Sequence, residues 1–193
     1  TKVVPGFVEA HPGIELDIRV DNRLVDAVAE GYDAGIRLIE SIDRDMVHVR
    51  LCPPGRFAVL GAPAYFERHG TPQKPEDLLQ HACICIRSAP DRPTYAWELE
   101  RGKKSWRVPV KGPVVTNDST FMHRLAVAGV GLLYAFEPTV AEDVKRGALR
   151  VVLESYAAEV PGLFLYFPSR AQVSPALKAF VEYVRAQPNK SRR

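Results

Sequence analysis

The sequence lacks any apolar run that could span a membrane, and it has too few cysteines for a disulfide framework. Its longest apolar stretch, Gly162–Phe167, has the length of a strand, whereas a membrane-spanning helix needs roughly 20 residues. The opening residues 1–12 have the pattern of an amphipathic helix rather than of a secretory signal peptide. Of the three cysteines, which include Cys52, the pair Cys83 and Cys85 would share one face of a strand. Buried, reduced thiols are therefore favoured over a metal or redox pair.

The sequence also lacks a strong charge of either sign. The 193 residues carry a formal net charge of +3, and the charged side chains are spread along the chain. Such a mild positive charge does not by itself indicate nucleic-acid binding. The composition is that of an ordinary globular protein, and the length allows one domain or two small lobes.

No recognisable catalytic or metal-binding motif is present. The sequence has no G-x-S-x-G segment, and its histidines are too far apart for paired metal ligands: His11, His48, His69, His81 and His123. Gly129–Gly131 follows a predicted helix and lacks the third glycine of a dinucleotide loop, so we interpret it as a helix end. Glu98 and Glu100 alternate along a predicted strand, which favours a solvent-facing side. We expect no metal, no cofactor and no catalysis.

Hydrophobic periodicity predicts alternating helices and strands. Apolar residues alternate over Ile14–Val20, which predicts a strand with one buried face. A helix capped by Asp21 or Asn22 and ended by Gly31 should follow. Asp33–Ile39 is predicted to be the next strand. This order indicates a parallel sheet with crossover helices.

The rest of the chain continues in short elements. Strands are predicted at 47–51, 57–60, 83–87, 95–99, 105–110, 132–135, 149–153 and 162–167. Helices are predicted to begin at 62, 75, 121, 137 and 174, with Ser174 and Pro175 starting the last one. Breaks at Pro53–Gly55 and Pro161–Gly162 mark forced turns or crossings.

Five segments in this order can be compared with a known family. They read FVEAHPGIEL at 7–16, GYDAGIR at 31–37, APAYFERHG at 62–70, NDS with AVAGVGLL between 117 and 133, and FPSR with SPAL between 167 and 177. Together they resemble the effector-binding domain of LysR-type transcriptional regulators. The resemblance implies an α/β, periplasmic-binding-protein-like (type 2) fold of two Rossmann-like lobes joined by two crossing segments. Lobe I would be 1–55 with 161–193, lobe II would be 56–160, and a ligand cleft would lie between them.

Two departures from the family pattern stand out. These residues include no match to the N-terminal winged helix-turn-helix of these regulators or to the strand that normally precedes the first helix, so we expect the sequence to be a fragment or to begin before the residues given. That strand would be expected in the middle of the first lobe's sheet.

Candidate effector-binding residues follow predicted strands, where ligands of open α/β sheets bind. Asp21–Asn22 and Thr116–Ser119 (Thr116, Asn117, Asp118 and Ser119) combine short polar side chains with a helix N-terminus, which favours an anion. Arg37 could clamp a carboxylate, and Phe136 could form an apolar wall. A small organic acid is the predicted ligand class.

Structural interpretations of the same residues stay open. Asn117, Asp118 and Ser119 could cap their own helix, and Asp118 would repel an anion unless neutralised. Arg37 could pair with a surface carboxylate such as Glu40 or Asp43, and Phe136 could belong to the core.

The resemblance implies a regulatory domain in the cytoplasm. Its partners would be a small-molecule effector, further copies in a homodimer or homotetramer, promoter DNA through the absent N-terminal domain only, and RNA polymerase; no membrane is implied. One alternative is a solute-binding protein of a transport system, and another is an enzyme on the same scaffold. The second would need a nucleophile, a cofactor lysine or a metal set, none of which is evident.

Overall fold

The structure, a computed structural model, describes residues 3–21, 30–168 and 173–187. The chain divides into two compact units. Unit 1 comprises Thr1–Pro54 with Pro161–Arg193, and unit 2 comprises Gly55–Val160. The chain therefore passes between the units twice, at or next to the predicted breaks Pro53–Gly55 and Pro161–Gly162.

The apolar run near the end of the chain is the central strand of unit 1. This strand, β11 (Leu163–Pro168), lies between β1 (Gly35–Leu38) and β2 (Met46–Arg50) and pairs antiparallel with both. The predicted strands at 33–39, 47–51 and 162–167 are thus confirmed. The expected parallel sheet is wrong for the described part of unit 1, because both of β11's neighbours run against it.

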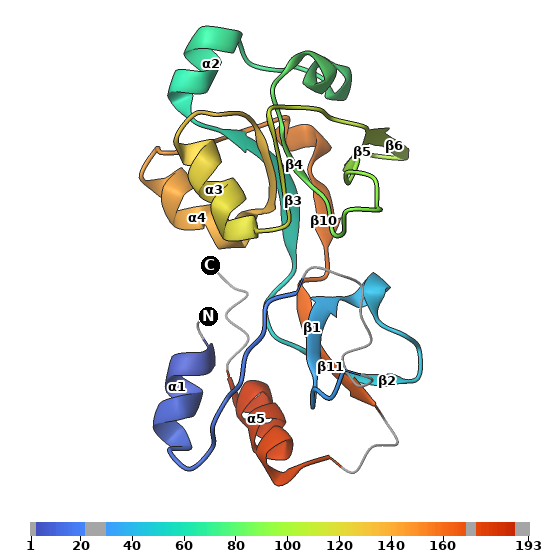
Figure 1. The fold of residues 1–193 in the computed structure, drawn as a ribbon, viewed down its shortest axis with the longest axis vertical. Helices are drawn as coiled ribbons and strands as arrows, with labels where there is room; N and C mark the ends of the chain where they lie inside the picture. The colour runs from blue at the N-terminus through green and yellow to red at the C-terminus, as the bar shows by residue number, and fades with distance from the viewer. Residues whose placement is uncertain (1–2, 22–29, 169–172, 188–193) are drawn as a thin grey trace. The chain divides into compact units, whose positions relative to one another are not determined.

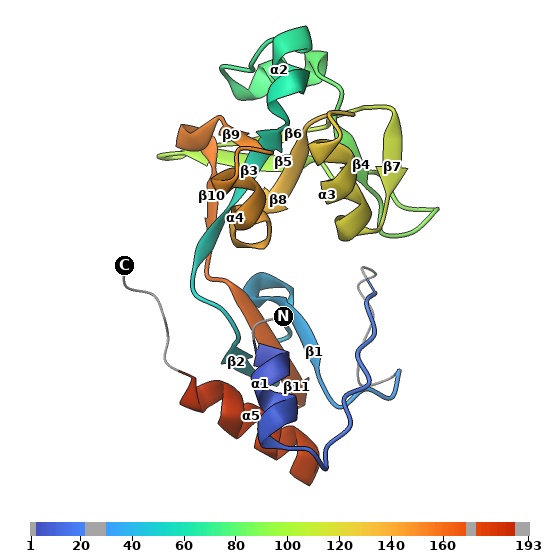
Figure 2. The same ribbon diagram turned by 90° about the vertical axis from the view of Figure 1, so that its left-hand side faces the viewer.

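The described part of unit 1 also contains helices α1 (Val3–Ala10) and α5 (Pro175–Ala186), as Figures 1 and 2 show. The apolar face of α5 packs on β2 and β11 through Leu177, Val181 and Val184. Its predicted cap is confirmed, since the Ser174 hydroxyl accepts a hydrogen bond from the Leu177 N–H at 3.2 Å. Helix α1 lies beside α5, with the buried Phe7 ring edge-on to Phe180.

The predicted strand at Ile14–Val20 is wrong, because the structure assigns this segment no strand. Alternation alone does not make a strand, since its backbone groups need a partner. No described strand pairs with it, and Ile18 and Val20 are 61% and 87% exposed. The helix predicted after Asp21 and Asn22 lies largely outside the described residues. The additional strand that the resemblance places in this sheet stays a prediction.

Unit 2 is built around β3 (Gly55–Gly61), which pairs antiparallel with β8 (Leu133–Phe136) along one side. Two short strands, β9 (Arg150–Val152) and β10 (Ala158–Val160), pair with different parts of β3. Beyond β8 the sheet becomes parallel. Cys83 forms a parallel bridge with Leu132, and β4 (Ile84–Ile86) pairs parallel with β7 (Val114–Thr116).

Both faces of this sheet are buried. Helices α3 (Ser119–Val127) and α4 (Glu137–Lys145) cover one face, and the hairpin of β5 (Trp97–Arg101) and β6 (Lys104–Val108) lies on the other (Figures 1 and 2). The hairpin's face also receives α2 (Pro63–His69). The remaining elements are short 3₁₀ turns, η1 (Ile39–Ser41), η2 (Pro75–Gln80) and η3 (Glu154–Tyr156).

The two nearby cysteines behave as core residues. Cys83 and Cys85 are 0% and 1% exposed and belong to the cluster under the hairpin, while Ile84 between them faces the helices. The predicted shared face is therefore confirmed. Burial raises the pKa of both thiols, so neither is an activated thiolate.

Candidate functional site

Three parallel strands of unit 2 end at the same edge of its sheet. The carboxyl ends of β7, β4 and β8 are followed by Asn117, Arg87 and Glu137. The Arg87 N–H donates to the Thr116 carbonyl at 3.1 Å, which ties two of these ends together. We call this edge, from Thr116–Ser119 through Arg87 to Phe136, the carboxyl edge. Ligands of open α/β sheets bind beyond such an edge.

The junction between β7 and α3 is a built helix cap. The Thr116 hydroxyl accepts a hydrogen bond from the Asp118 N–H at 3.2 Å, and the Asp118 carboxylate accepts one from the Phe121 N–H at 2.9 Å. The capping interpretation is thus confirmed for Asp118. Asn117 and Ser119 are exposed beside it. The junction presents exposed polar groups next to the positive end of α3's dipole.

At the junction of β8 and α4, Phe136 is a core residue. It is 7% exposed and lies against the Phe57 ring, with 5.7 Å between the centroids. The next residue, Glu137, forms an ion pair with Arg56 of β3. The hydrogen bond from Arg56 to Glu137 raises the pKa of the guanidinium, which favours its charged form. Arg56 and Glu137 therefore neutralise one another at this end of the carboxyl edge.

Sequence reasoning missed Arg87. It follows the apolar run Cys83–Ile86 directly, and its exposed side chain has no ion-pair partner among the described residues. A basic residue immediately after a fully apolar strand was the available signal, because that position falls at the ligand-binding edge of a parallel sheet.

Arg37 belongs to unit 1. It lies in β1, and its Nε donates to the Tyr166 hydroxyl of β11 at 3.2 Å. Gly35, paired with Tyr166, makes this arrangement possible, because a Cβ there would lie 2.4 Å from the tyrosine ring. Asp21 is exposed in the same unit, and Asn22 lies outside the described residues. The structure thus brings Thr116–Ser119 and Phe136 to one edge of unit 2, and it places Asp21 and Arg37 in unit 1.

In the described ranges, no three histidine, cysteine or acidic side chains gather in a way that could hold a metal ion. The one buried charged residue there, Asp143, contacts His123 Nε2 and Arg146 Nη2. The contact with His123 links α3 to α4, and Arg146 directly follows α4, so both partners of the carboxylate are structural.

Solved structures with the same fold are regulatory domains. The CrgA regulatory domain of Neisseria meningitidis, a LysR-type transcriptional regulator, superposes with a TM-score of 0.77 at 21% identity, covering 95% of this chain and 88% of that one. The regulatory domain of C227S AphB from Vibrio vulnificus gives 0.79 at 17% identity, covering 96% and 91%. The chain therefore has the periplasmic-binding-protein-like type 2 fold of these domains.

Sequence comparison gives the family. Residues 1–189 match the LysR substrate binding domain, and the chain belongs to that family. A putative transcriptional regulator of Pseudomonas aeruginosa is 38% identical over 95% of this chain and 60% of its own length. The HTH-type transcriptional regulator PgrR of Escherichia coli is 31% identical over 91% and 59%.

The chain thus spans about 60% of the length of these relatives. Within the described ranges, none of the helices has the length and hydrophobicity that crossing a membrane requires.

Proposed function

We propose that this chain is the effector-sensing domain of a LysR-type DNA-binding transcriptional regulator and that it acts in the cytoplasm without catalysing a reaction. The observation that carries the proposal is the family match over residues 1–189, together with relatives that are named transcriptional regulators. A transport protein is not favoured, because the relatives are regulators.

The proposed effector is a small organic acid, bound by its carboxylate at the carboxyl edge. Asn117 and Ser119 would offer polar groups beside the positive end of α3's dipole, and Arg87 would offer a cation. Asp118 is less of an obstacle to an anion than its charge suggests, because its carboxylate is engaged with the Phe121 N–H. We propose Arg37 as a second cation for the effector and Phe136 as part of the apolar support behind Glu137.

The proposed mechanism is a population shift. An effector biases the conformational equilibrium of the domain in proportion to its differential affinity for the available states. The domain would pair with further copies in a homodimer or homotetramer, and promoter DNA would be bound by the N-terminal part of the whole regulator. The chain described here should therefore bind an effector but no specific DNA sequence.

A thermal-shift screen against small carboxylates, each paired with its uncharged amide, tests this function. Binding to the folded state alone stabilises it by about 2.7 kcal/mol at a hundredfold excess over Kd. We expect a saturable rise in Tm for one class of carboxylates, with the compound recovered unchanged. Consumption of the compound would instead support an enzyme, and a rise only for amides would contradict the proposed anion site.

A further inference from the structure

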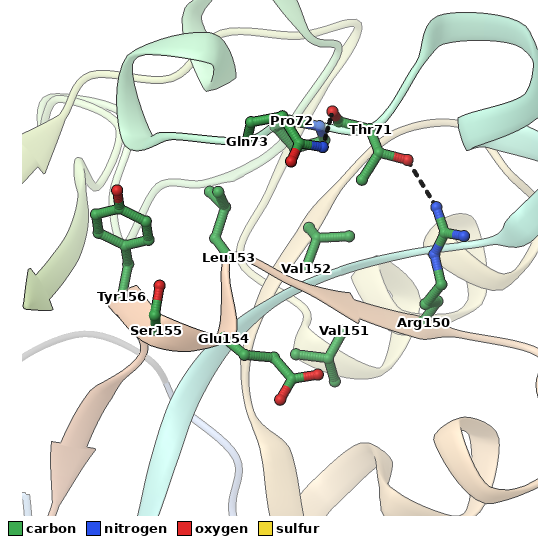
Figure 3. Close-up of a pocket in the computed structure, with 10 residues that line it drawn as sticks. All are labelled: Thr71, Pro72, Gln73, Arg150, Val151, Val152, Leu153, Glu154, Ser155 and Tyr156. Carbon is green, nitrogen blue, oxygen red and sulfur yellow. Dashed lines mark hydrogen bonds between the residues drawn. The ribbon is translucent and has the colours of Figure 1, made fainter.

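Unit 2 contains a hollow of about 400 Å³ that is separate from the carboxyl edge. Figure 3 shows it between the loop Thr71–Gln73, which follows α2, and the segment Arg150–Tyr156. Its size lies within the range of pockets that bind small molecules. No residue of the proposed effector site lines it.

The hollow lies where an edge strand is interrupted. Val152 pairs with Val59 and Ala158 pairs with Phe57, so residues 153–157 lie opposite Ala58 alone. This unpaired segment, residues 153–157, begins at Leu153. The φ of Leu153 is 54°, which is the one left-handed value of a non-glycine among the described residues. Bulged strands and strained backbone of this kind are concentrated at binding sites.

The hollow contains a cation without an acidic partner. Arg150 Nη2 donates to the Thr71 hydroxyl at 2.7 Å, and the guanidinium lies over the Phe66 ring, 4.4 Å from its centroid. Arg150 forms no ion pair in the described part of the chain. The Glu154 carboxylate, which also lines the hollow, is instead 3.8 Å from Arg56. Guanidinium groups bind carboxylates with two parallel hydrogen bonds, and the remaining N–H groups of Arg150 are suited to this.

The rest of the lining is mainly polar, and its aliphatic side chains are largely buried in the core. Val152 and Leu153 present methyl groups beside the Gln73 amide and the Ser155 hydroxyl (Figure 3). Tyr156 is held at one end, because its hydroxyl accepts from Arg101 Nη1 at 3.3 Å. We propose that this hollow is a second small-molecule site, which binds a small carboxylic acid through Arg150. The site does not depend on the proposed effector site.

Titration with sodium isovalerate tests the second site. The probe is added to ¹⁵N-labelled chain at ionic strength matched with sodium chloride, and isovaleramide serves as the uncharged comparison. We expect saturable shifts of the backbone amides confined to Thr71, Gln73 and residues 150–156, and none with isovaleramide. The R150Q variant should weaken binding of isovalerate about tenfold or more. The R150K variant keeps the positive charge but loses the paired N–H donors of the guanidinium, so its affinity should lie between those of R150Q and the unmodified chain. The R107Q variant is the matched control, since this arginine is 75% exposed on β6 and outside the hollow.

Three outcomes would overturn the proposal. These are no saturable shift at residues 150–156, equal binding by R150Q and R107Q, or shifts confined to Asn117–Ser119. The last result would assign the acid to the carboxyl edge and leave the proposed function standing. Conversely, failure of the effector screen would leave a positive titration at Arg150 unaffected.

Discussion

The Arg37→Ala variant is expected to lose effector binding while keeping its fold. If the guanidinium meets the effector's carboxylate, removing it leaves a charge unpaired, which costs about 2–5 kcal/mol of binding free energy. The affinity should then fall by roughly 30-fold or more. Within the protein, the substitution removes the hydrogen bond from Arg37 Nε to the Tyr166 hydroxyl, which is worth about 1 kcal/mol of stability. Isothermal titration with the acid found in the screen measures the affinity.

Tyr166→Phe is the matched control, because it removes the same hydrogen bond and keeps the guanidinium. We expect it to bind the acid within a few-fold of the unmodified chain. Arg87→Ala reports on the other candidate cation. An unchanged affinity for Arg37→Ala, together with a large loss for Arg87→Ala, would remove Arg37 from the site and leave the carboxyl edge in it.

Trp97→Ala is expected to be the most destabilising single substitution considered for unit 2. Trp97 is 1% exposed and stacks on Tyr134, with 5.5 Å between the ring centroids and 20° between the planes. Truncating such a buried aromatic side chain costs about 3–5 kcal/mol, from lost burial and from the cavity left behind. This is a large part of a typical folding free energy of about 5–15 kcal/mol. Urea unfolding followed by circular dichroism measures it.

Trp106→Ala is the control for Trp97→Ala, because it also removes a tryptophan but one that is less buried. Trp106 lies on the adjacent strand of the same hairpin, but it is only half-buried and donates its Nε1–H to Glu76 at 2.9 Å. Its removal should cost about 1 kcal/mol. Equal losses of stability in the two variants would contradict the assignment of Trp97 to the centre of the core.

The strands with buried partners could be predicted from the sequence, and the unpaired segment could not. Alternation over Ile14–Val20 is a sound signal for a half-buried strand, yet pairing depends on another strand being present beside it. The run at Gly162–Phe167 was located correctly, but its direction relative to its neighbours was not. Residue pattern reports burial, whereas strand direction is set by the path of the chain.

The candidate site could be predicted only in part, for a similar reason. The polar run at Asn117–Ser119 was recognised from capping chemistry, and the structure shows that Asp118 does cap its helix. Arg87 was missed because its position at the carboxyl edge depends on β4 lying beside β7. The strand β10 was missed because three residues, Ala158–Val160, carry too little pattern to be distinguished from a loop.

The central claim is that a small acid binds the carboxyl edge of unit 2 without being consumed. Hydrogen–deuterium exchange of the chain, with and without the acid found in the screen, tests this most directly. Amides at the N-terminus of α3 that contact a bound carboxylate exchange more slowly, so peptides covering residues 114–121 should gain protection, and the acid should be recovered intact. Unchanged exchange over 114–121 with the site saturated, or conversion of the acid into a product, would contradict the account.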